Sequence, residues 1–223
     1  MWRDALLVGA KDLKVEFASR VGLNQIVPFA LAVLLLFGFA VGPARPSHAA
    51  AAGLFWVSML FAAVLAVQRS FAIESADDAA DGLRLSGLDP AGIFLGKAGA
   101  IALELVGLEV VLIVVAAIMY GVPLSGVGVL LAASLLATLG LAALGVLYGV
   151  VSVGARVRET LLPLLFLPVA APVLLAATKA WQASPGFSTA RGSASGWIEL
   201  LAIFAVVYGA LGALCFGPLL EDR

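Results

Sequence analysis

Acidic residues with helical spacing are the most informative polar feature of this sequence. Four carboxylates recur at i, i+3, i+4 and i+7: Glu74, Asp77, Asp78 and Asp81. That spacing places them on one face of a helix. They belong to a stretch that we call the charged segment, Gln68–Asp89, in a chain that is 63% hydrophobic and only 12% charged. Because charge is costly inside a membrane, we expect this segment to lie in water.

The charged segment is predicted to be an ordered, two-faced element. Its helix should continue from the preceding apolar run and stop near Asp81-Gly82, after which Asp81 would cap a short turn that ends at Gly87. Asp89-Pro90 then breaks the chain before the next apolar run. The alternative is a solvated linker with an acidic face. The charged segment lies between two predicted spans, a position that favours a role in receiving force from a partner protein. Residues 68–92 are therefore predicted to form a cytoplasmic coupling segment.

Three ionisable residues lie in or beside the third apolar run, where charges suggest function. Lys97 and Glu104 are seven residues apart, so they share a helix face about 10 Å apart along the axis. Glu104 and Glu109 are five residues apart and point about 140° away from each other. We predict that they line a pathway or serve in assembly. Alternatively, the span begins later and Glu104 lies at its interface.

Chemistry within the chain itself is not indicated. The stretch from Gly92 to Lys97 superficially resembles a phosphate-binding loop, but it is one residue short and Ala98 stands where Ser or Thr should hold magnesium. One histidine, His48, and one cysteine, Cys215, form no catalytic set, disulfide or cysteine metal cluster. We therefore expect no enzymatic activity and no metal site. The net charge of −1 does not point to a nucleic acid partner.

The elements that position these residues are predicted to be membrane-spanning helices. Apolar runs of about 17 or more residues indicate such helices. Six spans are expected: Gln25–Val41, Ala49–Val67, Ile93–Tyr120, Val127–Val153, Leu161–Thr178 and Ile198–Pro218. Pro163, Pro168 and Pro172 should kink the fifth span. Residues 1–223 are thus predicted to be one all-α membrane domain.

Basic residues predict its orientation. With a cytoplasmic N-terminus, ten of the 13 Lys and Arg residues fall in inside segments, as the positive-inside bias requires. Both termini and the charged segment are then cytoplasmic. Residues 1–23 precede the first span and are predicted to be an interfacial amphipathic helix, with Trp2, Leu6 and Phe17 near one face together with Leu13. The alternative is a plain extension of the first span.

The second span, the charged segment and the fifth span together resemble a known family. The residues that carry the resemblance are Gly53–Val57, Gln68–Phe71, Glu74, Asp81-Gly82-Leu83 with Leu85, Lys97 and Leu161–Leu175. Their order, in 223 residues with six predicted spans, is similar to that of haem exporter protein B. That protein is the permease of the ABC-type complex for cytochrome c maturation in bacterial inner membranes and some organelles. Arg84 and Ser86 depart from the family pattern, which often has an acidic residue and a second leucine after the Asp-Gly step.

The resemblance implies an ABC-2-like permease whose charged segment docks on an ATPase. The docking residues it implies are Glu74, Asp77, Asp81, Gly82, Leu83 and Arg84. Two copies of a cytoplasmic ABC ATPase would hydrolyse ATP with magnesium. Further partners would be a tryptophan-rich haem-handling membrane protein, a small single-span subunit and a periplasmic haem chaperone, besides membrane lipid and a second copy of the permease. The complex would export haem or release the loaded chaperone.

This chain alone is not expected to ligate haem. Haem iron takes His, Met, Cys or Tyr ligands, and the few residues of these types here form no plausible axial pair. Two alternatives stay open beside the haem permease. One is an ABC-2-type permease for another amphiphile, such as a drug or a lipid. The other is a proton-coupled carrier that uses Glu104 and Glu109 without an ATPase.

Overall fold

The computed structural model describes residues 1–19, 21–41, 47–76, 87–123, 125–153, 158–187 and 193–221. Over these residues the chain forms α-helices and no strand, so the all-α prediction is confirmed for this part of it. The helices are α1 (Trp2–Ser19), α2 (Val21–Ala40), α3 (His48–Ala76), α5 (Pro90–Tyr120), α6 (Val127–Val153), α7 (Arg158–Gln182) and α8 (Ser195–Glu221).

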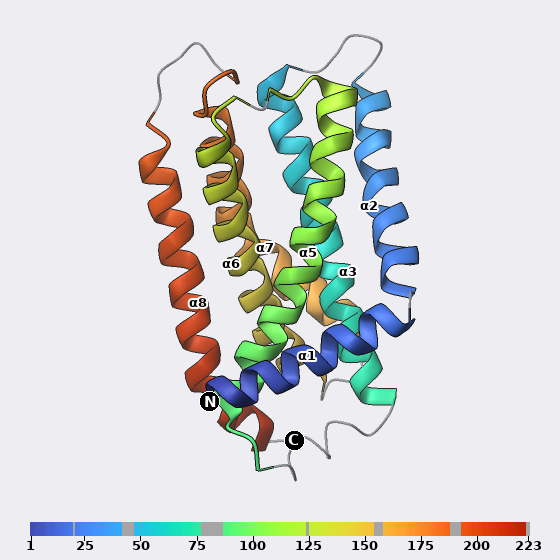
Figure 1. The fold of residues 1–223 in the computed structure, drawn as a ribbon, viewed down its shortest axis with the longest axis vertical. Coiled ribbons are helices and arrows are strands. Elements are labelled where there is room, and N and C mark those ends of the chain that lie inside the picture. Colours follow the sequence, from blue (N-terminus) through green and yellow to red (C-terminus); the bar gives the residue numbers. More distant parts are fainter. Residues whose placement is uncertain are drawn as a thin grey trace.

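Within the described ranges, five helices are long and apolar enough to cross a membrane: α3, α5, α6, α7 and α8. These five coincide with five of the six predicted spans. α2 occupies the place of the remaining one, but its apolar stretch, Asn24–Ala40, is shorter. Six crossings therefore depend on α2, which runs beside the other long helices (Figure 1).

The long helices stand side by side, and α1 lies across one end of them (Figure 1). The N-terminus and the end of α8 lie at that same end. α5 packs against every other described helix except α7, while α7 packs on α3, α6 and α8. Towards the other end, a buried aromatic cluster joins α3 to α7, and in it Phe55 stacks on Trp181 with ring centroids 4.4 Å apart.

Local sequence explains where α5 begins and ends. Asp89 caps its N-terminus by accepting a hydrogen bond from the Ala91 amide, and Pro90 takes the first helical position, where its missing N–H costs nothing. Gly121 ends the helix in a left-handed conformation with φ 67°, which glycine adopts without strain. The predicted break at Asp89-Pro90 is therefore confirmed.

Glycines on α6 allow close packing against α3. A Cβ added at Gly145 would lie 2.4 Å from Val67 Cγ2, and one at Gly149 would lie 2.2 Å from Phe71 Cε2. This small-residue step thus serves packing within the chain. The three prolines Pro163, Pro168 and Pro172 lie inside α7, and the kink expected from them stays a prediction.

Candidate functional site at the α1 end of the bundle

The predicted docking residues belong to the end of the bundle where α1 lies. Glu74 is in the last turn of α3. The others lie outside the described residues: Asp77, Asp81, Gly82, Leu83 and Arg84. Their docking role therefore stays a prediction. The described flanks show where the charged segment leaves and rejoins the bundle, because α3 ends and α5 begins beside α1 (Figure 1).

Glycines let α1 lie directly against the start of α5. A Cβ added at Gly96 would lie 2.6 Å from the Ala5 carbonyl oxygen, and one at Gly92 would lie 2.8 Å from the Met1 carbonyl oxygen. A Cβ at Gly9 would lie 3.1 Å from the Gly96 carbonyl oxygen. Small residues four apart permit such close helix crossings. The glycines that superficially resemble a phosphate-binding loop therefore serve to pack α1 on α5.

A buried ion pair joins the same two helices. Lys97 is buried, and its Nζ lies 3.4 Å from Asp12 Oδ2. The same Nζ lies 5.1 Å from the centroid of the Phe71 ring on α3, within cation–π range. Asp12 also pairs with Lys11 at 3.0 Å. Since burying an ion costs several kcal/mol, these partners are what make Lys97 tolerable in this position.

A second ion pair joins α1 to α3. Arg69 Nε donates to Glu16 Oε1 at 2.9 Å, and Arg69 Nη1 donates to Gln25 Oε1 of α2 at 3.3 Å. We call the contacts Gly9–Gly96, Asp12–Lys97 and Glu16–Arg69 the α1 interface. Through it, α1 contacts both of the helices that the charged segment connects.

The first turn of α1 reaches the cap of α5. The Met1 ammonium lies 3.0 Å from Asp4 Oδ2 and 3.4 Å from Asp89 Oδ2. The hydrogen bond from this ammonium lowers the pKa of the Asp4 carboxyl. Asp4 Oδ2 also accepts from the Asp89 amide at 3.4 Å. These contacts place negative charge at the N-terminus of α5, where the helix dipole favours it.

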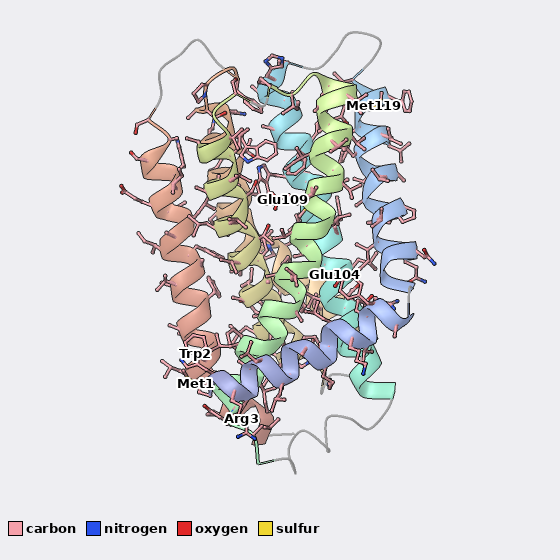
Figure 2. All side chains as sticks on the ribbon, viewed as in Figure 1. Met1, Trp2, Arg3, Glu104, Glu109 and Met119 are labelled. Atoms are coloured by element: carbon pink, nitrogen blue, oxygen red, sulfur yellow. The ribbon has the colours of Figure 1, made fainter. Side chains whose placement is uncertain are left out.

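The other faces of α1 point away from the protein. Trp2, Leu6 and Phe17 are 72%, 75% and 61% exposed, and Figure 2 shows Trp2 at the outer edge of the bundle. The described basic side chains of α1 are exposed as well: Arg3, Lys11 and Lys14. An apolar stripe beside a basic stripe suits the membrane–water interface. The predicted interfacial position of α1 agrees with this geometry and stays a prediction.

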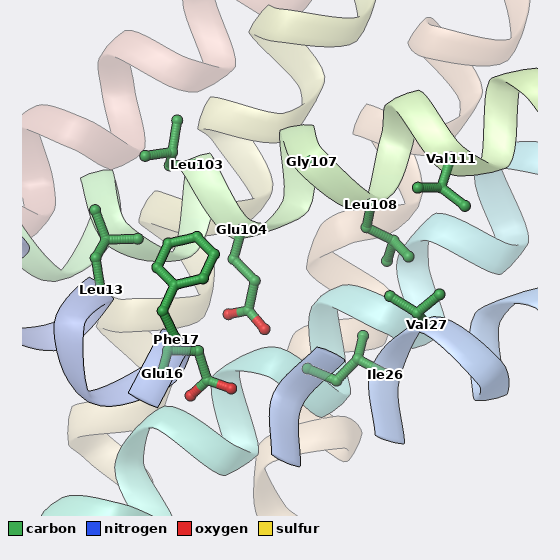
Figure 3. A pocket seen from close by; sticks show the side chains of 10 residues that line it. All are labelled: Leu13, Glu16, Phe17, Ile26, Val27, Leu103, Glu104, Gly107, Leu108 and Val111. Carbon is green, nitrogen blue, oxygen red and sulfur yellow. The ribbon is translucent and has the colours of Figure 1, made fainter. Parts of the chain in front are cut away.

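Glu104 points into a cavity between α1, α2 and α5 (Figure 3). The cavity measures about 110 Å³ and also contains Glu16. Its apolar walls include Leu13, Phe17, Ile26, Val27, Leu103 and Val111. Lys97 and Glu104 both lie against α1, in keeping with the shared helix face that their spacing predicts, but Lys97 is used in an ion pair and does not line this cavity.

Glu109 lies inside the bundle, farther from α1 than Glu104 (Figure 2). Its Oε2 accepts a hydrogen bond from Thr138 Oγ1 of α6 at 3.1 Å. Its Oε1 is buried with no hydrogen-bond partner among the described residues. The carboxylate thus bonds within its own chain. The roles predicted for it in assembly or a pathway are not tested by this contact.

Two acidic residues of the α1 interface are absent from the sequence-based predictions. Asp12 and Glu16 are four residues apart, which places them on one face of α1. That spacing was the available signal. It does not reveal their partners, because Lys97 and Arg69 lie 85 and 53 residues away in the chain and are reached only through packing.

Comparison with known proteins finds a family match over most of the chain. The family model described as CcmB protein matches residues 3–221. The match therefore includes α1, the charged segment and all the long helices. No curated protein matches the chain.

Proposed function

Because the chain belongs to the CcmB protein family, we propose that it is the permease subunit of an ABC transporter complex for haem handling. Family membership supports a haem exporter permease role in cytochrome c maturation. The proposal adds that ATP hydrolysis by a partner drives either haem export or release of a haem-loaded periplasmic chaperone. The chain would act as a multi-pass protein of the bacterial inner membrane, with α2 as a sixth span.

The proposed partners carry out ATP hydrolysis and haem handling. Two copies of a cytoplasmic ABC ATPase bind ATP and magnesium. A tryptophan-rich membrane protein handles haem, and a small single-span subunit completes the complex. Among the described residues, no three His, Cys, Asp or Glu side chains gather where they could hold a metal ion.

One observation carries the coupling role: the α1 interface contacts both helices that the charged segment connects. Arg69 precedes residues 77–86 in the chain and Lys97 follows them, and each is paired with a carboxylate of α1. A push on the charged segment would therefore act on α3 and α5 together, since α1 holds both helices and separating them breaks at least one of these two ion pairs. α2 follows α1 in the chain, and its Gln25 shares Arg69, so the displacement would pass on to α2.

Charge reversal in the charged segment tests this proposal. Asp81→Arg and Arg84→Glu, each made singly, should reduce co-purification of the ATPase, because like charges placed across an interface cost several kcal/mol. Glu199→Arg is the matched control, since Glu199 is exposed near the start of α8, a helix that begins at the end of the bundle opposite α1 (Figure 1). If the ATPase co-purifies fully with both charged-segment variants, the docking proposal fails.

A further inference from the structure

Glu104 is a partly buried carboxylate on α5. It lies in a cavity whose walls are mostly apolar, and it makes no hydrogen bond or ion pair with the described residues. Figure 3 shows its carboxylate directed into the space between Phe17 and Ile26. An ionised group among apolar side chains is costly unless a cation or a hydrogen-bond donor meets it. The cavity therefore favours a ligand that brings such a group.

Two acidic residues, Glu104 and Glu16, line the cavity, and Arg69 is a cation close enough to act on Glu104. The Oε1 of Glu16 already accepts from Arg69 Nε at 2.9 Å. Arg69 is in turn shared with Gln25. A head that carries both a positive charge and N–H donors would complement Glu104, because charge-assisted hydrogen bonds are the stronger ones.

The surroundings of the cavity favour a ligand with an apolar tail. Phe17, Leu103 and Val111 line it and are also exposed. Val110 and Val114 are exposed on the same helix and follow Leu103 by seven and eleven residues, so they continue this face along α5. In a membrane these side chains face acyl chains, so a ligand held at Glu104 can extend its tail along them.

We propose that the cavity binds a phospholipid with a primary ammonium headgroup, with Glu104 as the acceptor. A cavity of about 110 Å³ is well above the roughly 10–15 Å³ that one water requires by the same measure, so an ethanolamine head fits. A choline head has no N–H to donate, and sites for quaternary ammonium rely on several aromatic rings, whereas Phe17 is the one aromatic residue of this lining. Anionic headgroups are disfavoured because they would be repelled by the negative charge of Glu104.

Lipid titration of the full-length chain tests the site. The protein is purified in detergent, stripped of lipid and titrated with phosphatidylethanolamine, phosphatidylcholine or phosphatidylglycerol of identical acyl chains, and bound lipid is counted by native mass spectrometry. Phosphatidylethanolamine should bind first. Glu104→Gln should lower the affinity for phosphatidylethanolamine roughly tenfold, because it removes one hydrogen bond to a charged group. Glu199→Gln, the same change at an exposed site outside the cavity, should not alter binding.

A second variant blocks the cavity without removing the carboxylate. Gly107 lines the cavity, and a Cβ added there has no atom within 4 Å, so Gly107→Leu should fold and fill the space. Gly99 on the same helix is equally open but lies outside the lining, which makes Gly99→Leu the control. Gly107→Leu should lose the bound lipid and Gly99→Leu should keep it. Equal binding of all three lipids, or an unchanged preference in Glu104→Gln and Gly107→Leu, would overturn the proposal.

Discussion

The two members of the ion pair between α1 and α5, Asp12 and Lys97, are buried to different extents. The side chain of Lys97 is 2% exposed and that of Asp12 is 15% exposed, and Asp12 has Lys11 as a second partner at 3.0 Å. The desolvation penalty therefore falls mainly on the lysine. Removing the carboxylate should harm the fold more than removing the lysine, because only the first change takes a counter-charge away from a buried ion.

Substitution of each partner tests this asymmetry. Asp12→Ala should lower the free energy of unfolding by about 3 kcal/mol, since it breaks a buried pair at the acidic side. Lys97→Met should change it by about 1 kcal/mol or less, since an apolar side chain of similar size often replaces a buried charge without loss. Denaturant unfolding in detergent micelles measures both. Equal losses for the two variants would contradict the account.

Substitutions of Glu109 test whether its carboxyl has a structural role or takes up and releases a proton. Glu109→Gln keeps an oxygen for the Thr138 hydroxyl, so stability and cytochrome c assembly in a complementation assay should stay near wild type. Glu109→Leu leaves that hydroxyl buried and unpaired, which costs about 1–3 kcal/mol. If Glu109→Gln folds normally but abolishes cytochrome c assembly, a proton-coupled pathway through Glu109 replaces the structural role.

At the scale of helices, the sequence predicted the elements better than their contacts. Apolar runs located α3 and α5–α8 because a span needs about 20 apolar residues in a row. Asp89-Pro90 marked the start of α5 through local capping chemistry. The docking of α1 could not be predicted, because it depends on Gly96 meeting Gly9 and on Gly92 meeting the first turn of α1. Glycine spacing alone does not say which helix will approach.

Valine substitutions test the docking of α1. Gly96→Val should displace α1, because any Cβ at Gly96 meets the Ala5 carbonyl oxygen at 2.6 Å, which is backbone and cannot move aside. Gly99→Val should not, since nothing lies within 4 Å of its Cβ position. A cysteine placed at buried Val8, in a Cys215→Ser background, reports the change through maleimide labelling. Protection of that cysteine in Gly96→Val would show that α1 does not need this contact.

At the scale of the whole molecule, the end of the bundle that carries α1 gathers most of the candidate functional features. The charged segment leaves and returns there, and the described end of α8 lies there too (Figure 1). The positive-inside bias predicted this grouping, since basic residues mark one side of the membrane. This bias could not predict which face of α1 packs on the bundle. The structure shows that the acidic face does, with ion pairs to Lys97 and Arg69.

Cysteine labelling tests the orientation. In a Cys215→Ser background, a membrane-impermeant maleimide should label Ser193→Cys in spheroplasts, because Ser193 is exposed two residues before α8, and α8 begins at the end of the bundle opposite α1 (Figure 1). Lys14→Cys, on the exposed basic face of α1, should react only after the membrane is opened. Labelling of Lys14→Cys from outside, with Ser193→Cys protected, would reverse the proposed topology.

Cross-linking from the charged segment tests the central claim most directly. Leu83→Cys, in a Cys215→Ser background and carrying a short photoreactive maleimide, should cross-link to the ABC ATPase in native membranes. Ser193→Cys with the same reagent should not. The account predicts an ATPase adduct from Leu83→Cys whose yield changes when nucleotide is added. An ATPase adduct from Ser193→Cys alone, or none from Leu83→Cys, would contradict the role of this segment in coupling.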